Sequence, residues 1–222
     1  MTIPLKVYER LNGIENMRLD EELLFKAESG TPGCRVYAWD GPWVTLGRFQ
    51  SSISDLVDPQ YPLWVQRPTG GKAVLHGHDV TVGLGIPLSL LFPEVQQRGI
   101  KPIYRAVVEP IVEALNACGL PAALAENTSY SNRGRHTADC FAFSSPNDIV
   151  NRMTGQKVCG CALRITDKSV LVQASIPNGP PLVDPVSVIV NADRGEYQAW
   201  DAKGFSDALR SALTRLGYSR PQ

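Results

Sequence analysis

The chain has 222 residues, of which 43% are hydrophobic and 20% charged, so it can bury a sizeable core without disulfide or metal staples. Lysine plus arginine and aspartate plus glutamate both number 22, and this zero net charge argues against a dedicated nucleic-acid-binding protein. The 5 cysteines are scattered and odd in number, unlike a secreted disulfide framework, and they form one close pair where tetrahedral zinc usually needs two.

Neither the N-terminus nor the apolar stretches indicate a membrane protein. The opening MTIPLKVYER lacks a basic region followed by an apolar one, so we expect no signal peptide. The longest apolar stretch without charges, Val80 to Pro93, is too short to span a bilayer. We therefore expect a cytoplasmic protein without membrane contact.

The first part of the chain predicts a strand, a helix and a hairpin. A short strand is expected at Lys6–Glu9. Apolar residues then recur at helical spacing from Asn16 to Glu28, which predicts a helix with Asn16 as its N-cap and Gly30 as its stop signal. The strand-like runs Cys34–Trp39 and Trp43–Leu46 flank an Asp-Gly-Pro turn, which is typical of a hairpin.

The remainder predicts further strands and two helices. Pro110 should kink the first of these helices or delay its start. Strands gathered in hairpins with helices between them indicate an α+β fold, a mixed and mainly antiparallel sheet packed by helices on one side. The expected strands are Leu63–Gln66, Ala73–His76, Val80–Ile86 and the hairpin Lys157–Ile165 with Ser169–Ile176; the expected helices are Pro102–Cys118 and Ala202–Leu216, the latter capped by Gly217.

Three segments contain residues that could carry chemistry. The glycine pair Gly70-Gly71 lets the backbone approach a ligand, although an ordinary hairpin turn also favours such a pair. Cys140 lies between apolar neighbours, where a cysteine is usually a small buried hydrophobe. Lys157 opens an apolar strand, where it either points into a cleft or protects a sheet edge, and Gly160 marks a close approach to that strand.

The order and combination of these segments resemble the biotin/lipoate protein ligase superfamily. NMRLDE (residues 16–21) is similar to its N-M-A-x-D-E helix, and WVTLGRFQ (43–50) to its aromatic strand ending in T-x-G-x-x-Q. RPTGGKAVLH (67–76) is similar to the R-P-T-G-G-R-A-V-L-H signature of the octanoyltransferase branch. GQKVCGCA (155–162) is similar to the strand G-x-K-V-x-G-S-A that carries the family's lysine. The resemblance implies a class II biotin/lipoate ligase-like catalytic domain, here a single domain over residues 1–222 without an accessory C-terminal domain.

The position of the cysteine resembles one group of octanoyltransferases. In that group the nucleophile lies in a C-F-x-x-P-like segment upstream of the lysine. Cys140, followed by Phe141 and Pro146, is similar to this segment, and Lys157 lies downstream. In the other group the cysteine lies well after the lysine, whereas here no cysteine follows Cys161.

The resemblance therefore implies an octanoyltransferase of lipoate assembly that needs no cofactor. It would move an octanoyl group from acyl carrier protein, through a thioester on Cys140, to a lysine of a lipoyl-carrier domain of a dehydrogenase complex or of the glycine-cleavage H protein. Lys157 would favour the thiolate and would hold the oxyanion or take the proton of the incoming amine. The acyl tail would lie in a tunnel between the Val80–Ile86 strand and the hairpin of Lys157–Ile165 with Ser169–Ile176. The implied substrate-binding residues are Arg67, Thr69, Gly70, Gly71, His76 and Gly160.

Two alternatives stay open. An ATP-dependent lipoate–protein ligase would use ATP and Mg²⁺, with Lys157 on the acyl-adenylate and Cys140 incidental; the N-D-I sequence at residues 147–149 is closer to that branch. A non-catalytic carrier-binding or amidotransferase-like relative is the other. The cluster of Arg133, Arg135 and Arg152 around the cysteine segment is a candidate docking face for acidic carrier proteins or simply a solvated loop.

Overall fold

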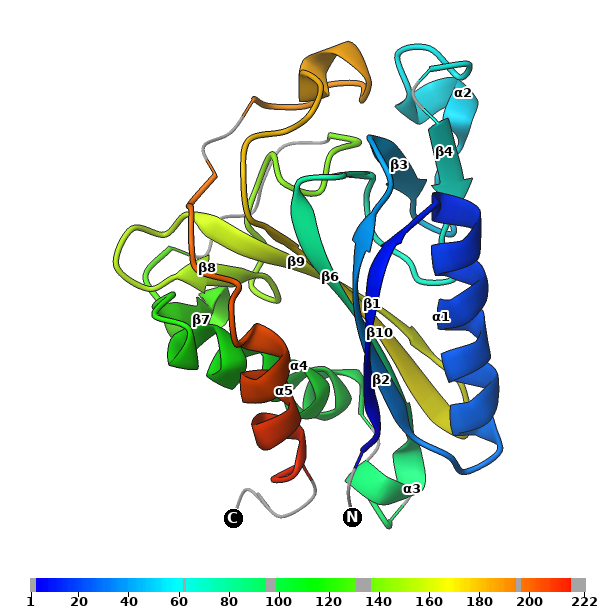
Figure 1. Cartoon of the computed structure of the whole chain (residues 1–222), viewed down its shortest axis with the longest axis vertical. Helices are drawn as coiled ribbons and strands as arrows, with labels where there is room; N and C mark the ends of the chain where they lie inside the picture. The colour runs from blue at the N-terminus through cyan, green and yellow to red at the C-terminus, as the bar shows by residue number, and fades with distance from the viewer. Residues whose placement is uncertain (1–2, 62, 95–98, 131–136, 195–196, 217–222) are drawn as a thin grey trace.

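The computed structural model describes residues 3–61, 63–94, 99–130, 137–194 and 197–216, whose helices and strands are shown in Figure 1. The strands are β1 (Leu5–Leu11), β2 (Gly33–Trp39), β3 (Trp43–Leu46), β4 (Leu63–Gln66), β5 (Val74–His76), β6 (Asp79–Pro87), β7 (Ala122–Leu124), β8 (Ile149–Asn151), β9 (Lys157–Ile165) and β10 (Ser169–Pro177). The helices are α1 (Gly13–Glu28), α2 (Ser52–Asp55), α3 (Leu88–Leu91), α4 (Ile100–Ala117) and α5 (Phe205–Leu213), with 3-10 turns η2 (Ala125–Asn127) and η3 (Pro185–Ser187). None of the described helices is long and apolar enough to cross a membrane.

Seven strands form a large sheet in the order β1-β2-β6-β10-β9-β8-β7. Strands β1 and β2 run parallel, and the other neighbouring pairs run antiparallel. The predicted hairpin of β9 and β10 is confirmed, with Val170 paired with Ile165 beside the turn. The α+β class with a mainly antiparallel sheet is therefore confirmed.

Helices cover both faces of this sheet, whereas the sequence predicts helices on one side (Figure 1). On one face, Asp20 of α1 accepts hydrogen bonds from Arg35 of β2 (2.8 Å) and Gln173 of β10 (2.6 Å). On the other face, apolar side chains of β6 and β10 join α4 and α5 in the main hydrophobic core. Side chains alternate between the two faces of a strand. The face under α1 is polar, so its residues did not indicate that a helix covers it.

Helix α1 begins one turn earlier than predicted. Asn12 is its N-cap and accepts a hydrogen bond from the backbone N–H of Glu15 (2.9 Å). Asn16, the predicted cap, is fully buried within the helix, and its side-chain oxygen accepts from Arg35 (2.7 Å). The predicted end is confirmed, because Gly30 has a φ of +91° just beyond the helix.

Helices α4 and α5 pack against each other over the large sheet (Figure 1). The predicted apolar face of α4 is confirmed, since Ile103, Val107, Ile111 and Ala114 are all buried. Pro110 lies inside α4 without delaying its start. Helix α5 occupies residues 205–213, which is shorter than the predicted 202–216, and the predicted cap at residue 217 lies outside the described residues.

A second, three-stranded sheet has the order β4-β3-β5, with β3 parallel to β4 and antiparallel to β5. The predicted hairpin of Cys34–Trp39 with Trp43–Leu46 is wrong, although both strands exist. The first pairs with β1 and β6, and the second pairs with β4 and β5. The turn at residues 40–42 therefore carries the chain from the large sheet to the small one, because a local turn signal does not determine which strands pair.

Candidate active site

Cys140 and Lys157 lie together at the centre of the candidate site. The Lys157 ammonium donates hydrogen bonds to the Cys140 carbonyl oxygen (2.6 Å) and to its Sγ (3.4 Å). The same ammonium forms an ion pair with Asp148 Oδ1 at 2.9 Å, and only 5% of the lysine side chain is exposed. The structure therefore places a cation directly beside a thiol.

Strand pairing brings Asp148 to the lysine. Lys157 is the first residue of β9, and it pairs with Val150 of the neighbouring strand β8. Asp148 immediately precedes β8, and its Oδ2 accepts a hydrogen bond from the backbone N–H of Ser145 (2.6 Å). Both oxygens of this carboxylate are thus held, which fixes the lysine beside the cysteine.

The ion pair keeps Lys157 positively charged. Burial alone would lower the pKa of this lysine, because a low-dielectric environment disfavours the ammonium. The negative charges of Cys140 and Asp148, with their hydrogen bonds, outweigh burial and raise the pKa above its ordinary value. An ammonium with a raised pKa is better suited to stabilising negative charge than to accepting a proton.

Gly160 makes room for the cysteine. It lies on β9, and a Cβ atom built there would lie 3.0 Å from Cys140 Sγ. The predicted close approach to this strand is therefore present in the structure. On its other side the cysteine segment is tied to the small sheet, because the backbone N–H of Cys140 donates to the Ala73 carbonyl (2.8 Å).

The glycine turn that precedes Ala73 is packed against the chain that follows β3. A Cβ at Gly47 would lie 1.9 Å from the carbonyl oxygen of Gly71, so the chain after β3 contacts the turn directly. Gly71 itself has a φ of +88°, which glycine adopts without strain. Gly70 is more open, with Phe49 its nearest neighbour at 3.9 Å from a built Cβ.

Arg67 organises this turn from within. Its guanidinium donates to the Gly70 carbonyl (2.7 Å), to the Lys72 carbonyl (2.6 Å) and to Thr45 Oγ1 (3.2 Å). Burial lowers its pKa to about 10. Thr69 is also fully buried, and its hydroxyl donates to Gln173 Oε1 (2.7 Å). Both side chains thus support the turn, and direct contact of either with a substrate stays a prediction.

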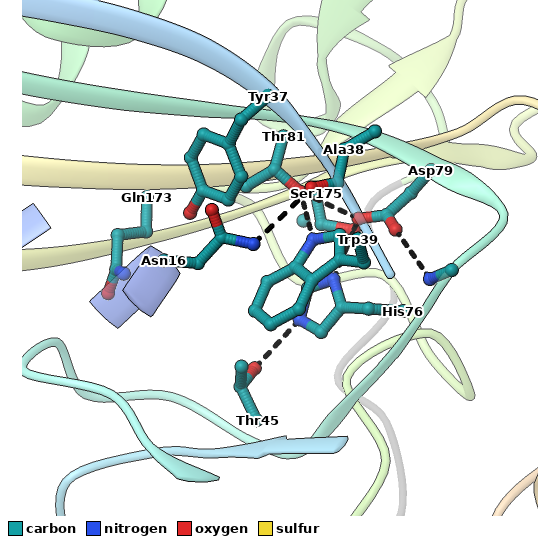
Figure 2. Close-up of polar contacts among 12 residues, drawn as sticks. Asn16, Tyr37, Ala38, Trp39, Thr45, His76, Asp79, Thr81, Gln173 and Ser175 are labelled. Atoms are coloured by element: carbon teal, nitrogen blue, oxygen red, sulfur yellow. Dashed lines mark hydrogen bonds and ion pairs between the residues drawn. The ribbon is translucent and has the colours of Figure 1, made fainter. Parts of the chain in front are cut away.

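His76 belongs to a buried polar network shown in Figure 2. Its Nδ1 is bonded to Asp79 Oδ2 (2.8 Å) and its Nε2 to Thr45 Oγ1 (2.9 Å), and its ring stacks on Trp39 with centroids 3.9 Å apart. The same Asp79 oxygen accepts from Ser175 (2.6 Å). Burial alone would raise the pKa of Asp79, but the charge and hydrogen bond of His76 outweigh it and lower the pKa to about 2.

Two hollows meet at the Cys140–Lys157 pair. The narrow one, here called the inter-sheet cavity, lies between the two sheets and ends beside Cys140 and Gly160; its other lining residues include Met17, Trp39, Val74 and His76. The wide one, here called the outer groove, has a volume of about 440 Å³, and its lining residues include His78, Phe141, Phe143, Lys157, Tyr197 and Gln198.

The location predicted for an acyl tunnel needs correction. Strands β6 and β10 are hydrogen-bonded neighbours along their whole length, so no tail can pass between them. The inter-sheet cavity instead lies over one face of this sheet, where Thr81 of β6 and Ser175 of β10 form part of its wall.

The contact between Asp148 and Lys157 was not predicted from the sequence. The motif around it, Pro146 to Ile149, is visible in the sequence, but its contact with Lys157 depends on the pairing of β8 with β9. Of the proposed docking arginines, Arg133 and Arg135 lie outside the described residues. Arg152 donates to Asn116 Oδ1 of α4 (3.2 Å).

Comparison with known proteins identifies a family model and curated relatives that match most of this chain. The family model "Lipoyl protein ligase A/B catalytic domain" matches residues 12–217. Octanoyltransferase LipM of Symbiobacterium thermophilum is 32% identical over 174 residues, which is 74% of this chain and 61% of the relative. Octanoyltransferase LipM of Anoxybacillus flavithermus is 32% identical over 168 residues, covering 71% of this chain and 58% of the relative. The match thus spans about three fifths of the length of these curated relatives.

Solved structures share the fold at lower identity. A structure of the bi-partite lipoate protein ligase of Thermoplasma acidophilum and its E2 lipoyl domain aligns with a TM-score of 0.68 and 21% identity, over 99% of this chain and 83% of that one. A crystal structure of lipoate-protein ligase A bound with ATP aligns with a TM-score of 0.69 and 23% identity, over 99% and 85%. These likenesses establish the architecture of the chain.

Proposed function

The chain belongs to the lipoyl protein ligase A/B catalytic domain family, and on that premise we propose that it is an octanoyltransferase of lipoate assembly. It would transfer an octanoyl group from acyl carrier protein to a lysine of a lipoyl-carrier domain, in a dehydrogenase complex or in the glycine-cleavage H protein. The observation that carries the proposal is the contact between the Lys157 ammonium and Cys140 Sγ, at 3.4 Å, where the two hollows meet.

In the first half-reaction, the thioester carbonyl lies beside Cys140 and the octanoyl tail enters the inter-sheet cavity, which must widen beyond its volume of about 40 Å³ to hold it. The Cys140 thiolate attacks the carbonyl carbon, and the bond from that carbon to the carrier sulfur breaks. Cys140 gives its proton to water when the thiolate forms, and the departing sulfur takes a proton from water and leaves as the carrier thiol. An octanoyl thioester on Cys140 remains.

Lys157 supports this step as a cation. Two of its N–H groups are fixed by the Asp148 carboxylate and the Cys140 carbonyl, and the third faces the sulfur. As negative charge moves from the sulfur to the carbonyl oxygen, this third N–H follows it and stabilises the oxyanion. Backbone N–H groups of Gly70 and Gly71 would supply further donors.

In the second half-reaction, the neutral amine of the acceptor lysine attacks the Cys140 thioester. The carbon–sulfur bond breaks, the amine's proton passes to the cysteine sulfur, and an amide and the free thiol result. Because Asp148 holds Lys157 in its charged form, we assign the lysine to charge stabilisation in both steps rather than to proton removal.

Intact mass spectrometry tests the proposal. Incubation with octanoyl–acyl carrier protein should add one octanoyl group without ATP, and hydroxylamine should remove it. The adduct should map to Cys140 and should persist in Cys159→Ser and Cys161→Ser proteins. Modification that requires free octanoate, ATP and Mg²⁺ would contradict the proposal and indicate a ligase.

A further inference from the structure

The outer groove adjoins the reacting pair on the Lys157 side, whereas the inter-sheet cavity adjoins it on the Cys140 side. Lys157 and Phe141 line the groove, and their neighbours Cys140 and Gly160 line the inter-sheet cavity. A thioester positioned at Cys140 with its tail between the sheets therefore directs its sulfur substituent into this groove. With a volume of about 440 Å³, the groove is large enough for a long substituent.

The walls of the groove combine aromatic rings with neutral polar groups. Phe143 and Tyr197 are 36% and 42% exposed, and Gln198 lies beside them. His78 also lines the groove; burial lowers its pKa, which favours the neutral ring, and its Nδ1 is buried without a hydrogen-bond partner among the described residues. Such an unpaired atom beside a groove calls for an explanation.

The charges in the groove argue against a nucleotide triphosphate. Among the described lining residues, the Lys157 ammonium is held by Asp148, and Arg194 is paired with Asp184 at 2.8 Å. The carboxylates of Asp139 and Asp193 line the same groove. Polyphosphates bind where free cations and backbone N–H groups converge, whereas both of these cations are already paired with carboxylates.

We infer that the outer groove binds the pantetheine arm of the acyl donor. This arm is a long, uncharged chain that contains amide and hydroxyl groups and a branched alkyl segment, which match the aromatic and neutral polar lining. The inference rests on the proposed function, because it assumes a thioester donor. It adds the site at which the enzyme recognises the part of the donor beyond the reacting sulfur.

Two donors with the same reacting group separate this site from the catalytic centre. Octanoyl-pantetheine carries the whole arm, whereas octanoyl-N-acetylcysteamine carries only the portion next to the sulfur. Phe143→Ala and Tyr197→Ala should each lower kcat/KM for acylation by octanoyl-pantetheine about three- to tenfold. Acylation by the short donor should remain unchanged. Phe25→Ala is the matched control, because Phe25 is 71% exposed on α1 and does not line the groove.

Equal effects of the groove variants on both donors, or no effect on either, would overturn the inference. Unchanged acylation with slower transfer to the acceptor would assign the groove to the acceptor instead. If the wild-type protein is not acylated by octanoyl–acyl carrier protein, the proposed function fails, and binding of the unreactive thioether S-octylpantetheine then tests the groove by itself. Weaker thioether binding in Phe143→Ala and Tyr197→Ala alone would still support the inference, whereas insensitive binding, or loss of ATP binding instead, would refute it.

Discussion

Two buried aspartates each hold a basic side chain, in very different settings. Asp148 pairs with Lys157 at 2.9 Å, and Asp79 pairs with His76 at 2.8 Å. His76 is bonded at both ring nitrogens and stacked on Trp39. Lys157 has a cysteine sulfur as one of its partners and lies where two hollows meet.

The comparison shows that an aspartate paired with a base is not by itself a sign of catalysis. What distinguishes the Lys157 pair is a nucleophile within reach, since His76 also lines a cavity. The His76 pair has its hydrogen-bonding capacity filled by the protein, so we expect it to maintain the cavity wall. Substitutions in the first pair should therefore change the rate, and substitutions in the second should change the stability.

The largest effect is expected at the reacting residues. Cys140→Ser and Lys157→Ala should each lower the octanoyl transfer rate by about 10³-fold or more, because a serine hydroxyl is a poor nucleophile and the alanine removes the cation. Because the two groups act in one step, the double variant should be little worse than either single variant. Rates from acyl carrier protein to a lipoyl domain test this, and effects that multiply in the double variant would show that the residues act independently.

A somewhat smaller effect is expected for Asp148→Asn. This change removes the charge that helps raise the pKa of Lys157, while burial continues to lower it. The lysine then loses its charge at a lower pH than in the wild type, so the alkaline decline of kcat should move to lower pH. At neutral pH we expect about a 10²-fold loss in rate. A pH–rate profile is the measurement, and an unchanged alkaline limb would show that Asp148 does not control the charge of the lysine.

Asp79→Asn should affect stability instead. The folded pKa of Asp79 is about 2, below its value of about 3.9 in an unfolded chain, so its contribution is present above pH 4 and is lost as the pH falls through 2. At pH 7 the variant should lose about 2 kcal/mol of unfolding free energy, with little change in the rate of Cys140 acylation. Urea unfolding measures the loss. Asp184→Asn, at an exposed ion pair, is the control and should change the unfolding free energy little. A large rate defect in Asp79→Asn would show that the His76 pair also takes part in catalysis.

The smallest effect is expected at Gly160. In Gly160→Ala the new methyl group would lie 3.0 Å from Cys140 Sγ, so the sulfur must shift by a few tenths of an ångström from its position beside Lys157. We expect acylation to slow by about three- to tenfold without loss of stability. Gly179→Ala is the control, because a Cβ there has nothing within 4 Å. Equal rates for both variants would show that Cys140 tolerates this displacement.

Much of the fold could be predicted because local patterns determine the elements. The apolar face of α4 and the turn between β9 and β10 are both readable from residue spacing. The pairing of strands could not be predicted from the sequence, and the wrong hairpin at residues 34–46 shows why. Both strands flank a good turn, yet long-range contacts place one in each sheet.

In the candidate site, too, some residues could be predicted from sequence motifs, whereas their contacts depend on the fold. Cys140 and Lys157 could be proposed from the order of the motifs, and the structure brings them into contact. The pairing of Lys157 with Asp148 required the register of β8 and β9. The role of Arg67 was also hidden, because nothing in a linear motif shows that a conspicuous arginine donates to the carbonyls of its own loop.

The hydroxyl of Thr45 has a consequence for protein engineering. One oxygen atom joins the Arg67 network under the glycine turn to the His76 network in the cavity wall. Replacing this threonine with valine, which has nearly the same shape, would leave His76 Nε2 without its partner and would remove one of the two bonds from Arg67 Nη1 to residue 45. A designer who grafts the glycine turn onto another scaffold should therefore transfer Thr45, Arg67 and His76 as one inseparable unit.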